Sequence, residues 1–138
     1  MERTTMQAAR FFLAFVGLCY LTLGVWCSAA PSHTSNSVGF DLQKGSGQSE
    51  FFTVYGGVEL AWGLIFLMPL LWSEFTRPLL IACVLIHGLS VVFRAISFLL
   101  FSGMGTTTYV LAGVEWAIFL ASAGLLLMSS TTGKTSEI

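Results

Sequence analysis

Three ionisable side chains lie inside long apolar stretches of the sequence, where charge is costly. Glu59 stands in "YGGVELAWG", Arg94 in "VVFRAISFLL" and Glu115 in "AGVEWAIFLASA". An arginine stays ionised and presents a planar fork of donors, so it can bridge two carboxylates from different segments. A carboxylate in such surroundings can also take up a proton or accept a hydrogen bond from a ligand. These residue types therefore offer ion pairing, proton exchange or ligand binding.

Four apolar blocks must position these side chains, at residues 10–30, 51–72, 78–101 and 109–129. Each block is about 20 residues long, enough to cross about 30 Å of hydrocarbon as a helix. Hydrophobic residues make up 55% of the chain and charged residues 9%, against about 25% charged residues in soluble domains. The sequence predicts an all-α, integral membrane four-helix bundle in one domain, with an outward loop over residues 31–50.

The first apolar block has a second interpretation. Small residues in "VWCSAAPS" follow an apolar run that has Arg3 and Arg10 before it, as in a secretory signal peptide. The run is longer than a usual signal core of about 7–15 residues, which favours a helix that is retained.

Positive residues are distributed unevenly between the two predicted sides. One side holds both termini with Arg3, Arg10, Arg77 and Lys134, and the other side holds Lys44. By the positive-inside rule we expect both termini in the cytoplasm, and a multi-pass protein of a bacterial inner (plasma) membrane. The net charge of −1 gives no basic patch for nucleic acid. The expected partners are the lipid bilayer and either another protein or further copies of this chain.

The three charged residues fall at a similar depth. Counted at about 1.5 Å per residue from the outward end of each block, Glu59, Arg94 and Glu115 lie about 12, 10 and 9 Å deep. We expect Arg94 to hold Glu59, with Glu115 as its second acceptor, and the two carboxylates to share one proton. This predicts a buried Glu–Arg–Glu cluster, and so a buried salt bridge, in the outer half of the bilayer.

Two more polar residues share helix faces with this cluster. His87 stands two helical turns from Arg94, and Tyr55 stands one turn from Glu59. The candidate ligand-binding or proton-linked residues are therefore Glu59, Arg94, Glu115, His87 and Tyr55.

One internal similarity suggests a repeat. The segment "GGVELAWGLIFL" at 56–67 resembles "AGVEWAIFLASA" at 112–123 through a shared Gly-Val-Glu-x-Ala. If these five positions do not match by chance, the first two helices and the last two form a parallel two-helix repeat.

The sequence contains no pattern typical of an enzyme. No nucleophile stands beside a base, and there is no phosphate-binding Gly loop, so no residue is assigned a catalytic role. Cys19, Cys27 and Cys83 lack the spacing of metal ligands, and no metal site is predicted. No cofactor is predicted either, although an apolar bundle with polar groups at one end suits a quinone or a lipid.

The pattern Tyr55-Gly56-Gly57-x-Glu59, then Arg94 with "AIS" and a Gly-containing loop, then Glu115, resembles a family of small uncharacterised bacterial membrane proteins in the DoxX-like group. The resemblance covers nearly the whole chain and implies a four-helix membrane bundle. The long first loop and "SGMG" depart from the family pattern. Some DoxX-like proteins are described as membrane subunits linked to quinol oxidation or redox complexes, but only the general fold carries over.

These observations favour a non-catalytic binding or complex-forming membrane subunit. Two alternatives stay open: a small amphiphile- or quinone-binding protein of DoxX-like type, and a dimeric proton-coupled transporter. A purely structural role for the charged cluster also stays open, because buried ion pairs can fix helix pairing without chemistry.

Overall fold

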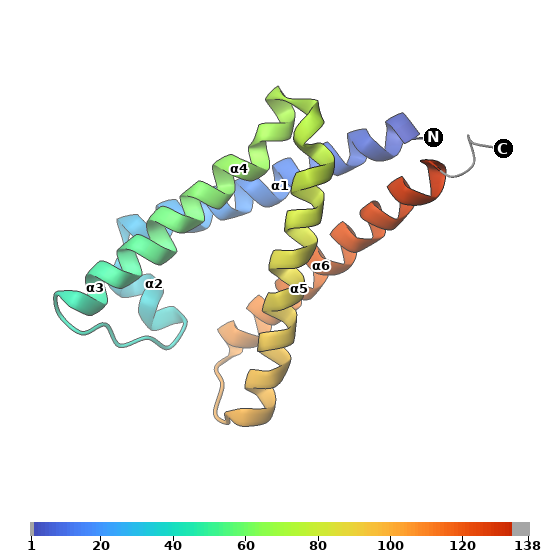
Figure 1. The fold of residues 1–138 in the computed structure, drawn as a ribbon. Helices are drawn as coiled ribbons and strands as arrows, with labels where there is room; N and C mark the ends of the chain where they lie inside the picture. Colours follow the sequence, from blue (N-terminus) through green and yellow to red (C-terminus); the bar gives the residue numbers. More distant parts are fainter. Residues whose placement is uncertain (1, 134–138) are drawn as a thin grey trace.

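The computed structural model describes residues 2–133, and every regular element in that part is a helix. Figure 1 shows their order: α1 (Glu2–Ala29), α2 (Pro31–Ser37), α3 (Ser46–Phe51), a π-helical segment (Phe52–Val58), α4 (Glu59–Leu71), a 3₁₀ turn (Ser73–Phe75), α5 (Thr76–Leu100) and α6 (Thr106–Gly133). The predicted all-α helical bundle is confirmed. Lys134, one of the positive charges counted above, lies outside the described residues.

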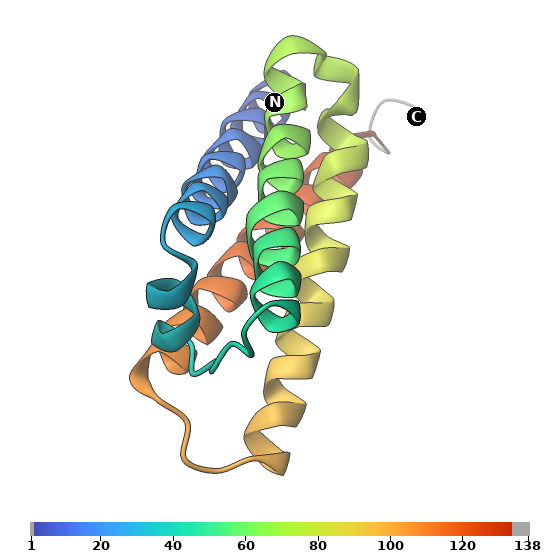
Figure 2. The same cartoon turned by 90° about the vertical axis from the view of Figure 1, so that its left-hand side faces the viewer.

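Within the described part, four helical stretches are long and apolar enough to cross a membrane: Arg3–Ala29, Ser46–Leu71, Ser73–Leu100 and Thr106–Ser129. Consecutive stretches run in opposite directions (Figure 2). We name one end of the bundle the turn end; it holds the beginning of α1, the 3₁₀ turn and the end of α6. The loop end holds residues 30–50 and 101–105.

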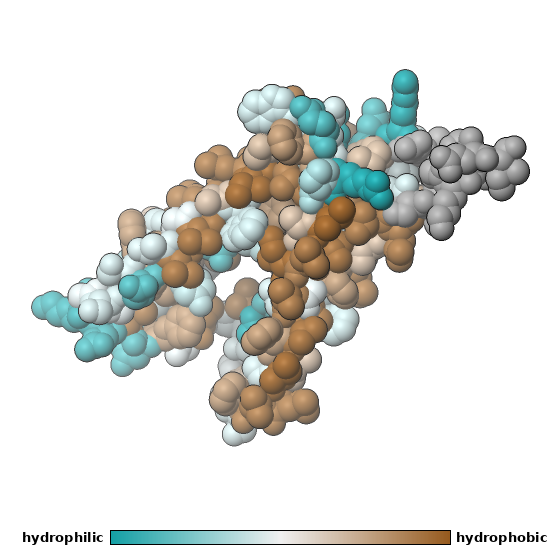
Figure 3. Space-filling view, viewed as in Figure 1, coloured by the Kyte–Doolittle hydropathy of each residue, from teal (hydrophilic) through white to brown (hydrophobic). Residues whose placement is uncertain are grey.

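Large apolar side chains cover the outside of the long helices, as the brown surface in Figure 3 shows. Phe11 is 71% exposed and Leu99 is 87% exposed within the protein. A water-soluble protein rarely exposes so much apolar surface, whereas lipid tails cover it without cost. The chain is therefore a multi-pass membrane protein.

The helices extend beyond the apolar blocks of the sequence. α1 begins at Glu2 rather than at residue 10, because hydropathy marks the part of a helix in hydrocarbon and not its end. Residues 31–50, predicted as a loop, contain α2 and the beginning of the second span. Pro31 suits the first position of α2, and the Thr34 hydroxyl donates a hydrogen bond of 2.9 Å to the Ala30 carbonyl.

Glycines bring α1 and the second span into backbone contact. A Cβ atom built on Gly17 would lie 2.8 Å from the carbonyl oxygen of Gly63, and one on Gly63 would lie 2.9 Å from the backbone nitrogen of Leu21. Nearer the loop end, a Cβ on Gly24 would lie 3.1 Å from the carbonyl oxygen of Gly56. Any side chain at these positions would push the helices apart, so small residues set their separation.

The apolar core lies in the half of the bundle nearer the turn end. Leu13 and Val16 of α1, Phe66 of α4 and Leu80 of α5 are fully buried there. Toward the loop end, the α5–α6 pair diverges from α1 and α4 (Figure 1), and the surface is notched between them (Figure 3). The two helix pairs thus share a core at one end and separate at the other.

The second span changes its helical form before Glu59. Residues Phe52–Val58 are π-helical, a form in which backbone hydrogen bonds join residues five apart rather than four. The segment contains Gly56 and Gly57. The wider turn rotates the side chains that follow it only slightly, so positions four apart still lie on nearly the same side.

The two Gly-Val-Glu segments have similar surroundings, in line with the predicted repeat. Gly56 and Ala112 are both buried, whereas Gly57 and Gly113 would each have nothing within 4 Å of an added Cβ. Two residues after each open glycine stands a glutamate, Glu59 or Glu115, which belongs to the site described next.

Candidate functional site

A cavity of about 230 Å³ lies between the two helix pairs, where the apolar core ends. All four long helices contribute to its wall. Its lining consists of Cys19, Tyr20, Leu23, Glu59, His87, Ser90, Leu111, Val114, Glu115 and Ile118. An apolar hollow with a few convergent polar groups is the usual form of a small-molecule site, although this one is smaller than the usual range, which begins at about 300 Å³.

Glu59 enters the cavity wall as the first residue of α4. Its Oε2 atom is buried and has no hydrogen-bond partner among the residues that the structure describes. A buried polar atom without a partner costs about 1–3 kcal/mol, and more when it is charged. The fold thus retains an acceptor that a ligand or a water molecule can satisfy.

His87 is held in one orientation by two neighbours. Its Nδ1 lies 2.9 Å from the Cys83 carbonyl oxygen, which can only accept, so Nδ1 carries the hydrogen. In the neutral ring Nε2 is then an acceptor, and the Tyr20 hydroxyl donates to it at 3.2 Å. His87 is 3% exposed, so the Tyr20–His87–Cys83 chain links α1 to α5 through the wall of the cavity.

Arg94 forms a two-pronged ion pair with Glu115. Arg94 Nε donates to Glu115 Oε2 at 3.0 Å and Nη2 donates to Oε1 at 2.6 Å. The pair is only partly enclosed by protein, with side chains 26% and 22% exposed. Arg94 lines a second hollow of about 370 Å³ with Ser90, Phe93, Ser97 and Glu115, so Glu115 is a wall of both hollows.

The expected bridge from Arg94 to both carboxylates is therefore corrected. Among the described residues Arg94 bonds to Glu115 and not to Glu59. The reason lies in the glycine contact, because α4 packs closely on α1 and keeps Glu59 on the opposite side of the cavity from the α5–α6 pair. Similar depth in the bilayer is not sufficient for a bond when the helices belong to different pairs.

Tyr55 packs among aromatic rings near the loop end, within electrostatic range of Glu59 and Arg94. Its ring stacks on Phe51 with centroids 4.7 Å apart and contacts Phe40 edge to face at 5.6 Å, and it is not part of the cavity wall. Tyr55 lies in the π-helical segment four residues before Glu59, and positions four apart in such a segment still lie on nearly the same side.

Sequence reasoning missed Tyr20, the polar group that α1 contributes. It lies nine residues before the end of α1 at Ala29, about 14 Å along the helix axis at 1.5 Å per residue. That depth matches the estimate for Glu59, so the same count applied to hydroxyl groups in the first apolar block would have found it. The depth count considered only ionisable residues and the residues that share a helix face with them.

The residues that the structure describes contain no group of three or more His, Cys, Asp or Glu side chains that could hold a metal ion. The three cysteines are free thiols, with Cys19 exposed and Cys27 and Cys83 buried. What the cavity offers is hydrogen bonding from an aromatic hydroxyl, an imidazole and a carboxylate within an apolar frame.

A family model described as a domain of unknown function, DUF4345, matches residues 8–127. No curated protein and no solved structure matched the chain. The family match includes all or most of each of the four long helices and every residue of the cavity wall. The chain therefore belongs to the DUF4345 family.

Proposed function

We propose that this chain is a non-catalytic membrane protein that binds a small amphiphile, with the polar head of the ligand in the cavity beside Glu59. The observation that carries the proposal is the buried, unpartnered Oε2 of Glu59 in a wall built by four helices. Natural proteins pair nearly all buried polar atoms, and an exception points to a missing partner.

The hydrogen-bond donors of the cavity are already engaged. The Tyr20 hydroxyl donates to His87, the Ser90 hydroxyl donates to the Ile86 carbonyl at 3.0 Å, and the His87 Nδ1 hydrogen is directed at a carbonyl. The acceptor of Glu59 remains. A complementary ligand head is therefore a donor, such as an alcohol, the phenolic hydroxyl of a quinol, or an amine.

An apolar groove continues from the cavity onto the exposed side of α1. It has a volume of about 450 Å³ and shares Cys19 and Leu23 with the cavity. Its remaining lining is Phe15, Leu18, Thr22 and Trp26. A ligand with its head at Glu59 can lay an apolar tail along this groove, which favours an amphiphile over a small polar solute.

The location of the protein is part of the proposal. The turn end carries Arg3, Arg10 and Arg77, whereas Lys44 lies at the loop end. From this distribution we infer cytoplasmic termini in a bacterial inner membrane, with the cavity in the outer half of the bilayer. The likeness to DoxX-like proteins, some of which serve quinol chemistry, is compatible with a quinol head but supplies no residue.

Alkylation of Cys19 tests the proposal, because this thiol is exposed and lines both the cavity and the groove. The purified chain in detergent micelles is labelled with N-ethylmaleimide, anaerobically, with and without decylubiquinol. We expect the quinol to slow labelling of Cys19 about tenfold, and Glu59→Leu, which leaves no acceptor, to remove most of that protection, because a hydrogen bond contributes about 0.5–1.5 kcal/mol.

Decylubiquinone is the matched control, because it has the same ring and tail but lacks the donor hydroxyls. It should protect Cys19 less than the quinol does. The buried thiols Cys27 and Cys83 should stay unlabelled and report that the fold is intact. Equal protection of Cys19 in the Glu59→Leu variant, or no protection by any donor head including dodecylamine, would contradict the proposal.

A further inference from the structure

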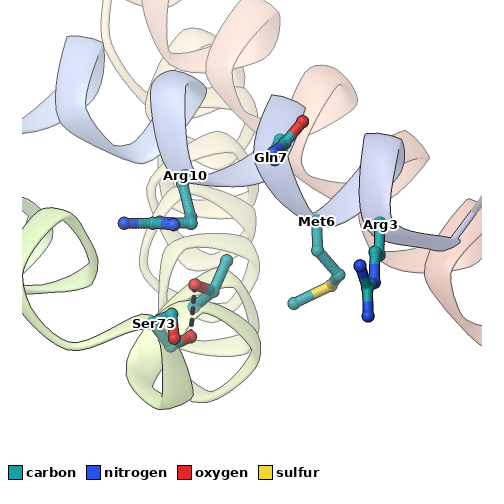
Figure 4. Close-up of a pocket in the computed structure, with 6 residues that line it drawn as sticks. Arg3, Met6, Gln7, Arg10 and Ser73 are labelled. Atoms are coloured by element: carbon teal, nitrogen blue, oxygen red, sulfur yellow. Dashed lines mark hydrogen bonds between the residues drawn. The ribbon is translucent and has the colours of Figure 1, made fainter.

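A third hollow, separate from the cavity and from the hollow at Arg94, lies at the turn end near the beginning of α1. It has a volume of about 400 Å³ between the beginning of α1 and the 3₁₀ turn. Its lining is Arg3, Met6, Gln7, Arg10, Ser73 and Thr76. In Figure 4 the guanidinium groups of Arg3 and Arg10 lie on the same side of α1 as Ser73. The hollow therefore gathers two positive charges and a hydroxyl group from separate elements.

Arg10 is fixed in place but is not saturated. Its Nε donates to the Pro69 carbonyl at 2.9 Å and its Nη2 donates to the Leu70 carbonyl at 3.2 Å, at the end of α4. A guanidinium has about five N–H donors, so most of them stay available. Because the carbonyls of a helix end carry partial negative charge, they orient the cation without neutralising it.

Arg3 has no hydrogen bond or ion pair with any residue that the structure describes, and it is exposed. Glu74 lies in the neighbouring turn, but the ion pair found within residues 2–133 is that of Arg94 and Glu115. Arg77 adds a further positive charge at the beginning of α5. The surroundings of the hollow are thus positive overall and suit an anion.

Aromatic side chains place this hollow at the membrane surface. Trp72 and Phe75, in the turn between α4 and α5, are 49% and 39% exposed and contact each other edge to face at 6.4 Å. Indole rings prefer the boundary between hydrocarbon and water, where the phosphate groups of lipids lie. The two arginines are therefore at headgroup level.

A narrow apolar groove leads from the hollow toward the hydrocarbon. It is lined by Gln7, Arg10, Phe11 and Leu70, two of which belong to the hollow as well. Phe11 and the neighbouring Leu71 are 71% and 76% exposed. An anion that also carries an acyl chain fits this continuous surface better than a free anion does.

We propose that Arg3 and Arg10 bind the phosphate of an anionic lipid headgroup, with one acyl chain along Phe11 and Leu70. Arg10 is held by the end of α4 and supplies the fixed donor. Arg3 has no protein partner and closes on the phosphate from the other side of the hollow. Ser73 adds a hydroxyl group at the rim.

Native mass spectrometry of the full chain, released from micelles doped with phosphatidylglycerol or phosphatidylcholine, tests this site. We expect phosphatidylglycerol to be retained preferentially, and Arg3→Gln to lower its occupancy at least fivefold. Arg77→Gln removes the same charge at the same end outside the hollow, and it should leave occupancy nearly unchanged. Arg3→Gln is the primary variant because Arg10 also stabilises the end of α4.

Added inorganic phosphate distinguishes a lipid site from a simple anion site. Phosphate at millimolar concentration should not displace the lipid, because it has no acyl chain for the groove. Displacement by phosphate would reassign the hollow to a free anion and overturn the lipid proposal. Equal retention of both lipids, or an equal loss in Arg77→Gln, would overturn it too, because binding would then be nonspecific.

Discussion

The two glutamates of the Gly-Val-Glu segments lie in one cavity, yet only one of them has a partner. Glu115 belongs to the α5–α6 pair and accepts two hydrogen bonds from Arg94. Glu59 belongs to the α1–α4 pair, and its buried Oε2 has no partner within the described residues. Two segments of similar sequence thus give one satisfied carboxylate and one that remains available.

The difference follows from how closely the two helices of each pair pack against each other. Between α1 and α4, glycines bring the backbones together, which leaves no room for a long side chain at Gly17, Gly24, Gly56 or Gly63. Between α5 and α6, side chains span the gap, since Gly88 faces the Phe119 ring and Arg94 reaches Glu115. Backbone packing makes a firm pair but offers no donor to Glu59, whereas the looser pair can satisfy its own carboxylate.

Removing Arg94, the partner of Glu115, should have the largest effect on the stability of the fold. Arg94→Leu leaves Glu115 in the apolar bundle without its cation, and we expect a loss of about 3 kcal/mol in the free energy of unfolding. Unfolding by sodium dodecyl sulfate in mixed micelles measures the change.

The double variant Arg94→Leu with Glu115→Leu is its control. Because it removes both charges, it should cost roughly 1 kcal/mol or less. If the double variant were as unstable as the single one, the loss would come from packing of the arginine stem and not from an uncompensated carboxylate.

Adding a side chain to the glycine contact between α1 and α4 should have the next largest effect on stability. Gly17→Ala places a Cβ 2.8 Å from the Gly63 carbonyl oxygen, and the strain should cost about 1–3 kcal/mol in the same assay. Gly113→Ala is the matched change in the other pair, where a Cβ meets nothing within 4 Å.

The control should be neutral or stabilising by up to about 1 kcal/mol, because alanine favours the helix over glycine. A similar loss in both variants would show that the cost comes from replacing a helical glycine as such and not from the close approach of α1 to α4. The comparison would then need another physical basis.

Loss of the Tyr20–His87 hydrogen bond, which links the two helix pairs, should have the smallest effect on stability. Tyr20→Phe removes the hydroxyl that donates to His87, and we expect a loss of about 1 kcal/mol, measured by the same unfolding. Tyr109→Phe is the control, because the Tyr109 ring stacks on Phe98 at 5.3 Å and is exposed. A loss in the control as large as that in Tyr20→Phe would argue against a specific role for the Tyr20–His87 bond.

The helices were predictable from the sequence because four apolar blocks of span length leave few other folds. The pairing of the helices was harder to foresee. Close approach of α1 to the second span depends on glycines in both. The role of Gly17 and Gly24 can be recognised only once the residues that face them are known. The missed pairing is also why Arg94 was expected to reach Glu59.

For the site, depth counting predicted that Glu59 and Glu115 lie together, helix-face spacing added His87, and all three line one cavity. Tyr55, which the same face spacing added, lies within electrostatic range of Glu59 but is not part of the cavity wall. Tyr20 was omitted because a lone hydroxyl in an apolar helix does not stand out in the sequence as a charge does. Its importance comes from the His87 ring that it contacts.

The groove along α1 is continuous with the exposed side of that helix, where Phe15 and Leu18 are 61% and 56% exposed. A ligand that enters along this groove arrives by diffusing within the bilayer and never has to pass through water. Occupancy is then governed by the number of ligand molecules per lipid, since both compete for the same apolar surface. Diluting a vesicle suspension with buffer would leave such a complex intact, whereas fusing it with ligand-free vesicles would empty it.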